Sequence, residues 1–168
     1  IPIEKEKNDE IKFILLNDEN KLSLAINTIP RDAIVAFDTE TTDIDTQKAQ
    51  IVGFSFAYED NIAYYVPISH YYLGAPEQIS KNAAKQAIIQ LNRHKLVLQN
   101  FKYDYEIIKN NFEIELKLYA DTMILSWLLD TNEKVGLDYQ INKYFNHKMI
   151  AFKDVVKKGE NFSNVDIL

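Results

Sequence analysis

The sequence predicts an α/β fold in which a mixed β-sheet is flanked by helices. Three short runs typical of strands, residues 33–37, 51–58 and 62–68, follow one another closely along the chain. Helical spacing of apolar residues and short strand-like runs then alternate over residues 80–145. Successive strands followed by alternating helices and strands are typical of a sheet covered by a layer of helices.

The first elements lead to a pair of acids. Residues 11–16 are predicted to form a strand, and apolar residues at helical spacing follow it: Leu22, Ala25, Ile26 and Ile29. Residues 33–37 form a short apolar run suited to a buried central strand, which ends abruptly at Asp38 and Glu40. We therefore expect both carboxylates at the end of a strand, and we expect residues 1–10, rich in Lys and Glu, to fray.

The middle of the chain predicts a hairpin and then helices. Residues 51–58 alternate, and residues 62–68 follow a Glu-Asp-Asn turn, so the two runs should pair. Ser80 is a candidate N-cap for a helix with an apolar face. Further on, the sequence predicts a strand at 96–98, a helix at 103–110, a brief strand through Leu116 and Leu118, a helix from an Asp121 cap through Leu129, and a helix over 137–145.

Composition favours a single soluble domain of 168 residues. The chain has no cysteine, no apolar run long enough for a membrane span and no secretory h-region, so we expect no membrane association and a cytoplasmic location. The first residue is Ile1, which suggests a piece of a longer protein.

The charge distribution is uneven. The net charge of −6 argues against a broad basic surface for gripping nucleic acid. Residues 1–90 carry 8 Lys and Arg against 14 Asp and Glu, whereas residues 91–168 carry 11 of each. An acidic cluster suits a site for divalent cations, and a merely acidic surface explains the total equally well.

Two short motifs carry the candidate chemistry. Asp38-Thr39-Glu40 places two carboxylates on one face of a strand, where their repulsion is costly unless a cation neutralises it. Oxygen ligands of this kind favour Mg²⁺ or Mn²⁺. Asp104 stands at the start of a predicted helix. Taken alone, the first pair also fits a solvated strand end, and Asp104 also fits simple helix capping.

Together these segments resemble the 3′→5′ proofreading exonuclease domain of bacterial DNA polymerase I, in the DEDD exonuclease group. Asp38-Thr39-Glu40-Thr41 resembles the first motif of that family and Asn100-Phe101-Lys102-Tyr103-Asp104 its second. The resemblance runs from about residue 33 to the end of the chain, through stretches such as Val52-Gly53-Phe54-Ser55-Phe56-Ala57 and Ala75-Pro76-Glu77-Gln78-Ile79-Ser80.

The resemblance implies a ribonuclease H-like fold and hydrolysis with two divalent cations, Mg²⁺ or Mn²⁺. It implies metal ligation and catalysis by three acids, Asp38, Glu40 and Asp104. It implies contacts to a single-stranded DNA 3′ end by Thr39, Ile44, Asn100, Tyr103 and Phe152. The implied product is a deoxynucleoside monophosphate, and the implied partner is a covalently linked polymerase domain.

A third family motif, a Tyr followed four residues later by an acid, is expected beyond Leu168. Phe162 and Asp166 have that spacing, but Phe162 lacks the hydroxyl and Asp166 falls in a terminus that we expect to fray. The three histidines have no metal-ligand spacing and are expected to be surface or structural residues. Two alternatives stay open: an RNA exonuclease of the ribonuclease D type, and a catalytically silent support for a polymerase.

Overall fold

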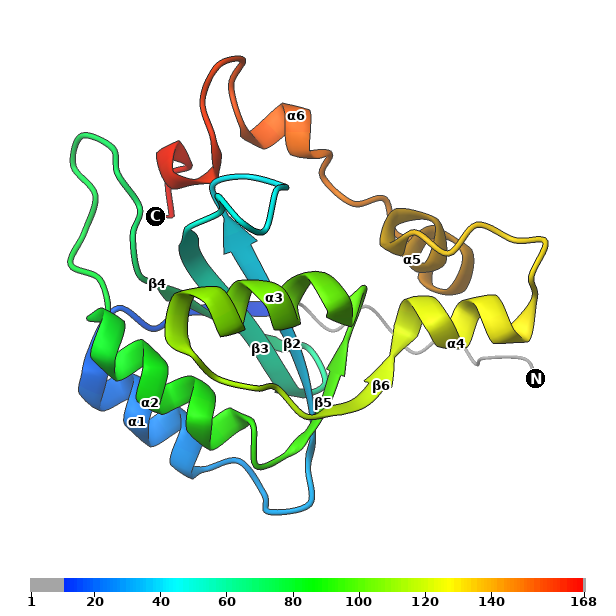
Figure 1. Cartoon of the computed structure of the whole chain (residues 1–168), viewed down its shortest axis with the longest axis horizontal. Coiled ribbons are helices and arrows are strands. Elements are labelled where there is room, and N and C mark those ends of the chain that lie inside the picture. Colours follow the sequence, from blue (N-terminus) through cyan, green and yellow to red (C-terminus); the bar gives the residue numbers. More distant parts are fainter. Residues whose placement is uncertain (1–10, 168) are drawn as a thin grey trace.

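Six strands form one mixed sheet within residues 11–167, the part of the chain that the computed structural model describes (Figure 1). They are β1 (Lys12–Leu15), β2 (Ile34–Thr41), β3 (Ile51–Glu59), β4 (Ile62–Pro67), β5 (Lys95–Leu98) and β6 (Leu118–Asp121). The strand order is β1-β4-β3-β2-β5-β6. β3 runs antiparallel to β2 and β4, and the other neighbouring pairs are parallel. The predicted fold class and the predicted hairpin are confirmed.

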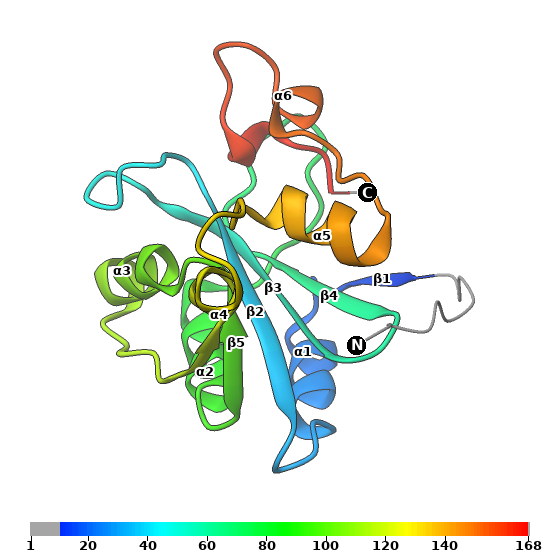
Figure 2. The same ribbon diagram turned by 90° about the vertical axis from the view of Figure 1, so that its right-hand side faces the viewer.

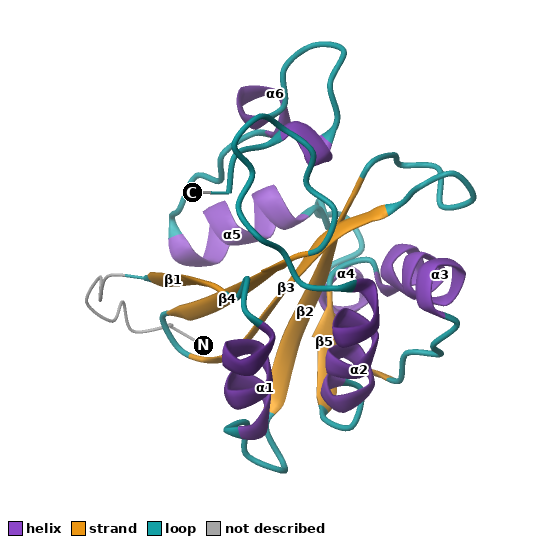
Figure 3. Ribbon diagram, turned by 90° about the vertical axis from the view of Figure 1, so that its left-hand side faces the viewer, coloured by secondary structure: helices purple, strands orange, loops and turns teal. Residues whose placement is uncertain are grey.

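Helices cover both faces of this sheet. They are α1 (Glu19–Asn27), α2 (Lys81–Leu91), α3 (Phe101–Phe112), α4 (Thr122–Leu129), α5 (Leu137–Phe145) and α6 (Phe152–Val155), followed by the 3-10 turn η1 (Phe162–Asn164). Figures 2 and 3 show α1, α2 and α3 on one face and α5 on the other. Within residues 11–167, no helix is long and apolar enough to cross a bilayer.

The hydrophobic core lies between the sheet and the helices α1, α2 and α3. Along β2, Val35 and Phe37 are buried in it, whereas the alternate residues Ala36 and Asp38 are exposed. The buried apolar residues of α2 form its inner face, and the Ser80 side chain caps the helix as predicted by accepting from the backbone N–H of Ala83. Strand alternation therefore leaves the opposite face of β2 free to carry polar side chains.

Some boundaries differ from the sequence prediction. β2 continues to Thr41, so the two acids lie inside the strand, because they pair with β3 through Asp38↔Ser55 and Glu40↔Gly53. The last strand begins at Leu118, since its register with β5 starts at the Leu96↔Leu118 pair. The predicted fraying of residues 1–10 falls outside the described residues. The elements α6 and η1 were not predicted.

Candidate active site

Asp38 and Glu40 project from the face of β2 that lies away from the α1–α2 core. They are two residues apart in one strand, which places both carboxylates on the same side of the sheet. Asp38 is exposed and Glu40 is half-buried. The predicted strand pair of acids is thus present, at the outer end of a central strand.

Asp104 reaches β2 from the first turn of α3. The pairing of β2 with β5 stops at Ala36↔Val97, so the backbone of β2 beyond Ala36 has an open edge on that side. There the backbone N of Thr39 lies 3.1 Å, and its Oγ1 2.6 Å, from Oδ1 of Asp104. Both groups donate to the carboxylate. Thr39 is buried and Asp104 is 2% exposed, so this bond fixes the third acid beside the first two.

The three acids influence one another electrostatically. Burial, and then the negative charges of Asp38 and Asp104, raise the pKa of Glu40 to about 8. Burial, and then the charge of Asp38, raise the pKa of Asp104 to about 7 against the opposing effect of the hydrogen bonds from Thr39. Asp38 keeps water-accessible surface, yet the protein around it displaces much of its solvent, and this desolvation raises its pKa. Three carboxylates with raised pKa values form an electrostatically strained cluster.

This cluster suits a divalent cation by its donor chemistry, because carboxylate oxygens are the ligands that Mg²⁺ and Mn²⁺ prefer. Within residues 11–167, no three His, Cys, Asp or Glu side chains already converge closely enough to hold a metal ion. One oxygen of Asp104 is engaged by Thr39, which leaves Oδ2 as its available ligand atom. Small side-chain movements would therefore accompany cation binding.

The loop after β2 is fastened to α3 by Tyr103. The hydroxyl of Tyr103 donates to the backbone carbonyl of Asp43 at 2.7 Å and also contacts Oγ1 of Thr41. Ile44 follows directly, and its side chain is 92% exposed. The structure thus places Tyr103 as an anchor for the loop that presents Ile44.

Asn100 lies at the entrance to α3 in the left-handed conformation, with φ of 64°. Its backbone N–H and that of Phe101 donate to the two carboxylate oxygens of Asp121 at 3.2 and 2.9 Å. Asp121 also caps α4 by accepting from Met123, as predicted. This double cap explains why α3 begins at Phe101, two residues before the predicted start.

The remaining predicted substrate residue, Phe152, lies at the start of α6 and is 65% exposed. Its exposure and that of Ile44 exclude ordinary core packing for both side chains.

The expectation that Asp166 lies in a frayed terminus is wrong. Its Oδ1 accepts a hydrogen bond from Tyr72 at 3.1 Å, and Tyr71 donates its backbone N–H to the carbonyl of Ser163 at 2.7 Å. Segment 161–167 therefore docks on the loop between β4 and α2.

Sequence reasoning missed two residues beside Glu40. Tyr65 pairs with Ser55, which in turn pairs with Asp38, so Tyr65 belongs to the face of the acids. Its ring crosses Gly53, where an added Cβ would lie 2.3 Å from the Tyr65 hydroxyl oxygen. Burial, and then the charge of Glu40, raise the pKa of Tyr65 well above its usual range. The hairpin register and the Gly opposite Glu40 were the signals that could have revealed this.

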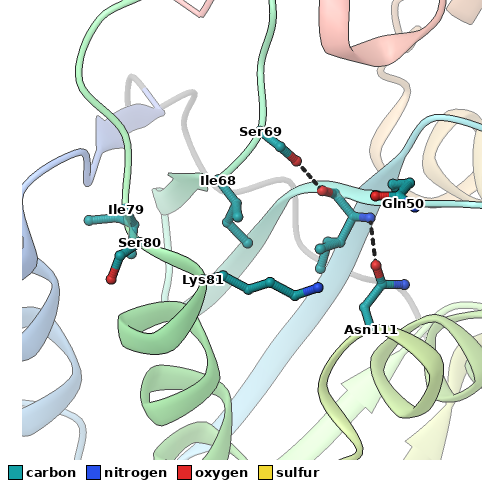
Figure 4. Close-up of a pocket in the computed structure, with 8 residues that line it drawn as sticks. Gln50, Ile68, Ser69, Ile79, Ser80, Lys81 and Asn111 are labelled. Atoms are coloured by element: carbon teal, nitrogen blue, oxygen red, sulfur yellow. Dashed lines mark hydrogen bonds between the residues drawn. The ribbon is translucent and has the colours of Figure 1, made fainter.

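A cavity of about 230 Å³ lies apart from the acids, between the N-terminus of α2 and the end of α3 (Figure 4). In its wall the backbone N–H of Ile51 donates to Asn111, and Ser69 donates to the carbonyl of Ile51. None of the three acids lines it.

Solved structures that share this fold include a nuclease and an exoribonuclease. Brucella melitensis NrnC bound to pGG aligns with a TM-score of 0.63 at 17% identity, covering 95% of this chain and 69% of that chain. Escherichia coli RNase D, an exoribonuclease, aligns with a TM-score of 0.61 at 16% identity, covering 83% and 35%. These likenesses show a ribonuclease H-like fold.

Relatives found by sequence identify the family more narrowly than the shared fold does. DNA polymerase I of Borreliella burgdorferi is 34% identical over 161 residues, and that of Pseudomonas aeruginosa 38% over 156 residues. They cover 95% and 89% of this chain, which spans only 17% of the length of each relative. Residues 13–167 match the 3′-5′ exonuclease family of family A DNA polymerases. The chain therefore belongs to the 3′-5′ exonuclease domain family of DNA polymerase I.

Proposed function

We propose that this chain removes nucleotides from the 3′ end of single-stranded DNA by metal-dependent hydrolysis, as the proofreading domain of a bacterial DNA polymerase I. The observation that carries the proposal is the cluster of Asp38, Glu40 and Asp104, brought from β2 and α3 to one site where burial, and then the charges of the neighbouring acids, raise the pKa of Glu40 and of Asp104. Clustered carboxylates repel one another when they are ionised, and a bound cation removes that repulsion, so such a cluster suits a cation site. The presence of the three acids argues against a catalytically silent support domain.

In this proposal Asp38, Glu40 and Asp104 hold two divalent cations, Mg²⁺ or Mn²⁺. Such cations, when bound, activate water and stabilise charge on the attacking and leaving oxygens of the phosphate. Thr39 holds Asp104 in place, and Tyr103 and Asn100 shape the wall along which the strand lies. The exposed side chains of Ile44 and Phe152 offer apolar surfaces to the terminal bases, a contact that tolerates any sequence.

Other proteins support the metal and the substrate class. NrnC was solved with bound Mg²⁺ and with pGG, so related folds accommodate a divalent cation and a dinucleotide. The relatives are bacterial DNA polymerases, which supports a cytoplasmic role in DNA replication and repair.

A covalently linked polymerase domain is proposed as the partner. The chain spans 17% of the relatives' length, and α4 carries an exposed apolar surface. Every large apolar residue of its second half is at least half exposed: Trp127, Leu128 and Leu129. Exposed apolar surface of this extent is typical of a face that another part of a protein covers.

The function is tested with 5′-labelled oligonucleotides of one sequence, made as single-stranded DNA and as RNA. In Mg²⁺ or Mn²⁺ the chain should shorten DNA stepwise from the 3′ end and release deoxynucleoside monophosphates. We expect DNA to be trimmed at least about tenfold faster than RNA, a difference of about 1.4 kcal/mol in transition-state binding. Faster trimming of RNA would instead favour a function of the ribonuclease D type.

We further propose that residues 1–168 alone form a slow exonuclease. The family resemblance implies a third motif whose Tyr orients water and whose acid completes the metal ligands. A chain extended by about 30 residues of its natural sequence should therefore be faster by on the order of 100-fold or more, since the loss of even one group that stabilises the transition state usually costs that much and two are missing. Rates measured side by side in Mn²⁺ decide this, and equal rates would make Asp166 the candidate fourth acid.

A further inference from the structure

His70 is a buried histidine with both ring nitrogens engaged. Its Nε2 lies 2.6 Å from the hydroxyl oxygen of Tyr65, and its Nδ1 lies 3.1 Å from the backbone carbonyl oxygen of Val165. A carbonyl oxygen only accepts, so the neutral ring carries its proton on Nδ1, and Nε2 accepts from Tyr65. Through one imidazole, the two bonds join Tyr65 and Val165, which are 100 positions apart in the sequence.

Through its bond with Tyr65, the His70 ring is connected to the face of the sheet that carries Asp38 and Glu40. Tyr65 lies across Gly53, which is the β3 partner of Glu40. Any side chain at position 53 would meet the Tyr65 ring and also the backbone carbonyl of Val66, at 2.8 Å from its Cβ. Because its hydroxyl proton is donated to His70, the orientation of the Tyr65 phenol beside Glu40 depends on His70.

Through its bond with the carbonyl of Val165, the His70 ring is also connected to segment 161–167. The Phe162 ring lies 6.1 Å from the His70 ring, and the turn η1 contacts β2. Neighbouring bonds hold the same segment: the Asn164 side chain donates to the carbonyl of Tyr71 at 3.1 Å, and the backbone N–H of Ile167 donates to the hydroxyl of Tyr72 at 3.2 Å. His70 stands at the centre of this contact.

We propose that His70 and Tyr65 are a pair of positioning residues that lock segment 161–167 and the Glu40 side of the active site into one arrangement. The catalytic part of this inference rests on the proposed exonuclease function. The pair touches neither substrate nor metal in this account. The pair holds the Tyr65 ring beside Glu40 and holds segment 161–167 against β2. Its loss should therefore impair positioning of the transition state more than ground-state binding of the DNA strand.

Three variants test the pair. His70→Leu removes both hydrogen bonds, and Tyr65→Phe removes one while keeping the ring over Gly53. His70→Gln restores both, because one amide has an acceptor for Tyr65 and a donor for Val165. His147→Leu makes the same change at an exposed histidine and serves as the control.

The first measurement needs no activity. In the unmodified chain, ¹⁵N NMR should show the His70 proton on Nδ1, and the amides of Tyr71 and Ile167 should exchange slowly with solvent. His70→Leu should speed that exchange by at least about tenfold, whereas His70→Gln and His147→Leu should not. Unchanged exchange in a folded His70→Leu chain, or a proton on Nε2, would overturn the proposed lock.

The second measurement is kinetic. With a DNA oligonucleotide in Mn²⁺, His70→Leu and Tyr65→Phe should lower kcat about tenfold at nearly constant KM, and His70→Gln should recover most of the loss. If His70→Leu loses amide protection but keeps its kcat, the His70–Tyr65 pair stabilises the structure only, and its proposed role in the reaction is overturned. If neither the unmodified chain nor the form extended by about 30 residues trims DNA, the proposed function fails, while the exchange and NMR results still decide the lock.

Discussion

Changing any of Asp38, Glu40 or Asp104 to its amide is expected to slow release of nucleotides from a DNA 3′ end by about 100-fold or more. Each amide keeps the size of the side chain but removes the negative charge that would hold a cation against the phosphate. Losing one group that stabilises transition-state charge costs on the order of 100–1000-fold in rate. Single-turnover degradation of a labelled oligonucleotide in Mg²⁺ gives the rates.

The matched control is Asp60→Asn, an exposed acid in the turn between β3 and β4. It should leave the rate unchanged, since that turn lies at the other end of the hairpin from Glu40. Calorimetric titration with Mn²⁺ supplies a second readout, in which the three site variants should lose binding and Asp60→Asn should keep it. An Asp104→Asn chain that retains full rate and full Mn²⁺ binding would remove Asp104 from the site.

The placement of Asp38 and Glu40 on β2 and of Asp104 in the first turn of α3 could be predicted from the sequence, because short motifs and strand alternation are local properties. The sequence prediction misplaced the end of β2, since Asp and Glu are poor strand formers and their pairing with β3 is a tertiary effect. The same limit explains α3, whose early start depends on the carboxylate of Asp121, about 20 residues further on. Boundaries set by distant partners are not visible in a local pattern.

Long-range hydrogen bonds were the larger omission. Thr39 was predicted as a substrate contact, but its hydroxyl is buried against Asp104, 65 residues away in the sequence. That bond does not test the predicted contact to DNA, but it does give Thr39 a structural role that spacing could not indicate. His70 was expected to be a surface or structural histidine, and its burial with both nitrogens bonded confirms the structural alternative.

The raised pKa values of Asp104 and Glu40 predict that the stability of the fold depends on pH. An acid whose pKa is raised in the folded state binds protons more tightly there than in the unfolded chain, so deprotonation destabilises the fold. Its contribution to stability is greatest below the unfolded pKa and is lost as the pH rises through the folded pKa. For Asp104 that window runs from its ordinary value of 3.8 to about 7, and for Glu40 from 4.5 to about 8.

Without divalent cations, the free energy of unfolding is therefore expected to fall between about pH 5 and pH 8.5 by on the order of 2 kcal/mol from Asp104 alone, since one pKa unit corresponds to about 1.4 kcal/mol. Mg²⁺ binds the deprotonated folded site, so it should restore stability at the high end, by about 2.7 kcal/mol at 100 times its Kd. Urea unfolding at several pH values, with EDTA or with Mg²⁺, measures both effects.

Asp104→Asn separates charge from hydrogen bonding at this position. The amide oxygen still accepts from the backbone N–H and the hydroxyl of Thr39, while the buried charge and its repulsion with Asp38 are gone. We therefore expect this variant to be more stable than the unmodified chain at about pH 8.5 in EDTA, to lose the part of the pH dependence that Asp104 contributes while Glu40 keeps its own, and to gain little from Mg²⁺. A variant that is instead less stable in EDTA would mean that the two Thr39 hydrogen bonds favour ionised Asp104 by more than burial and Asp38 disfavour it. The cluster would then be a satisfied structural network, and a cation would not be needed to hold its charges together.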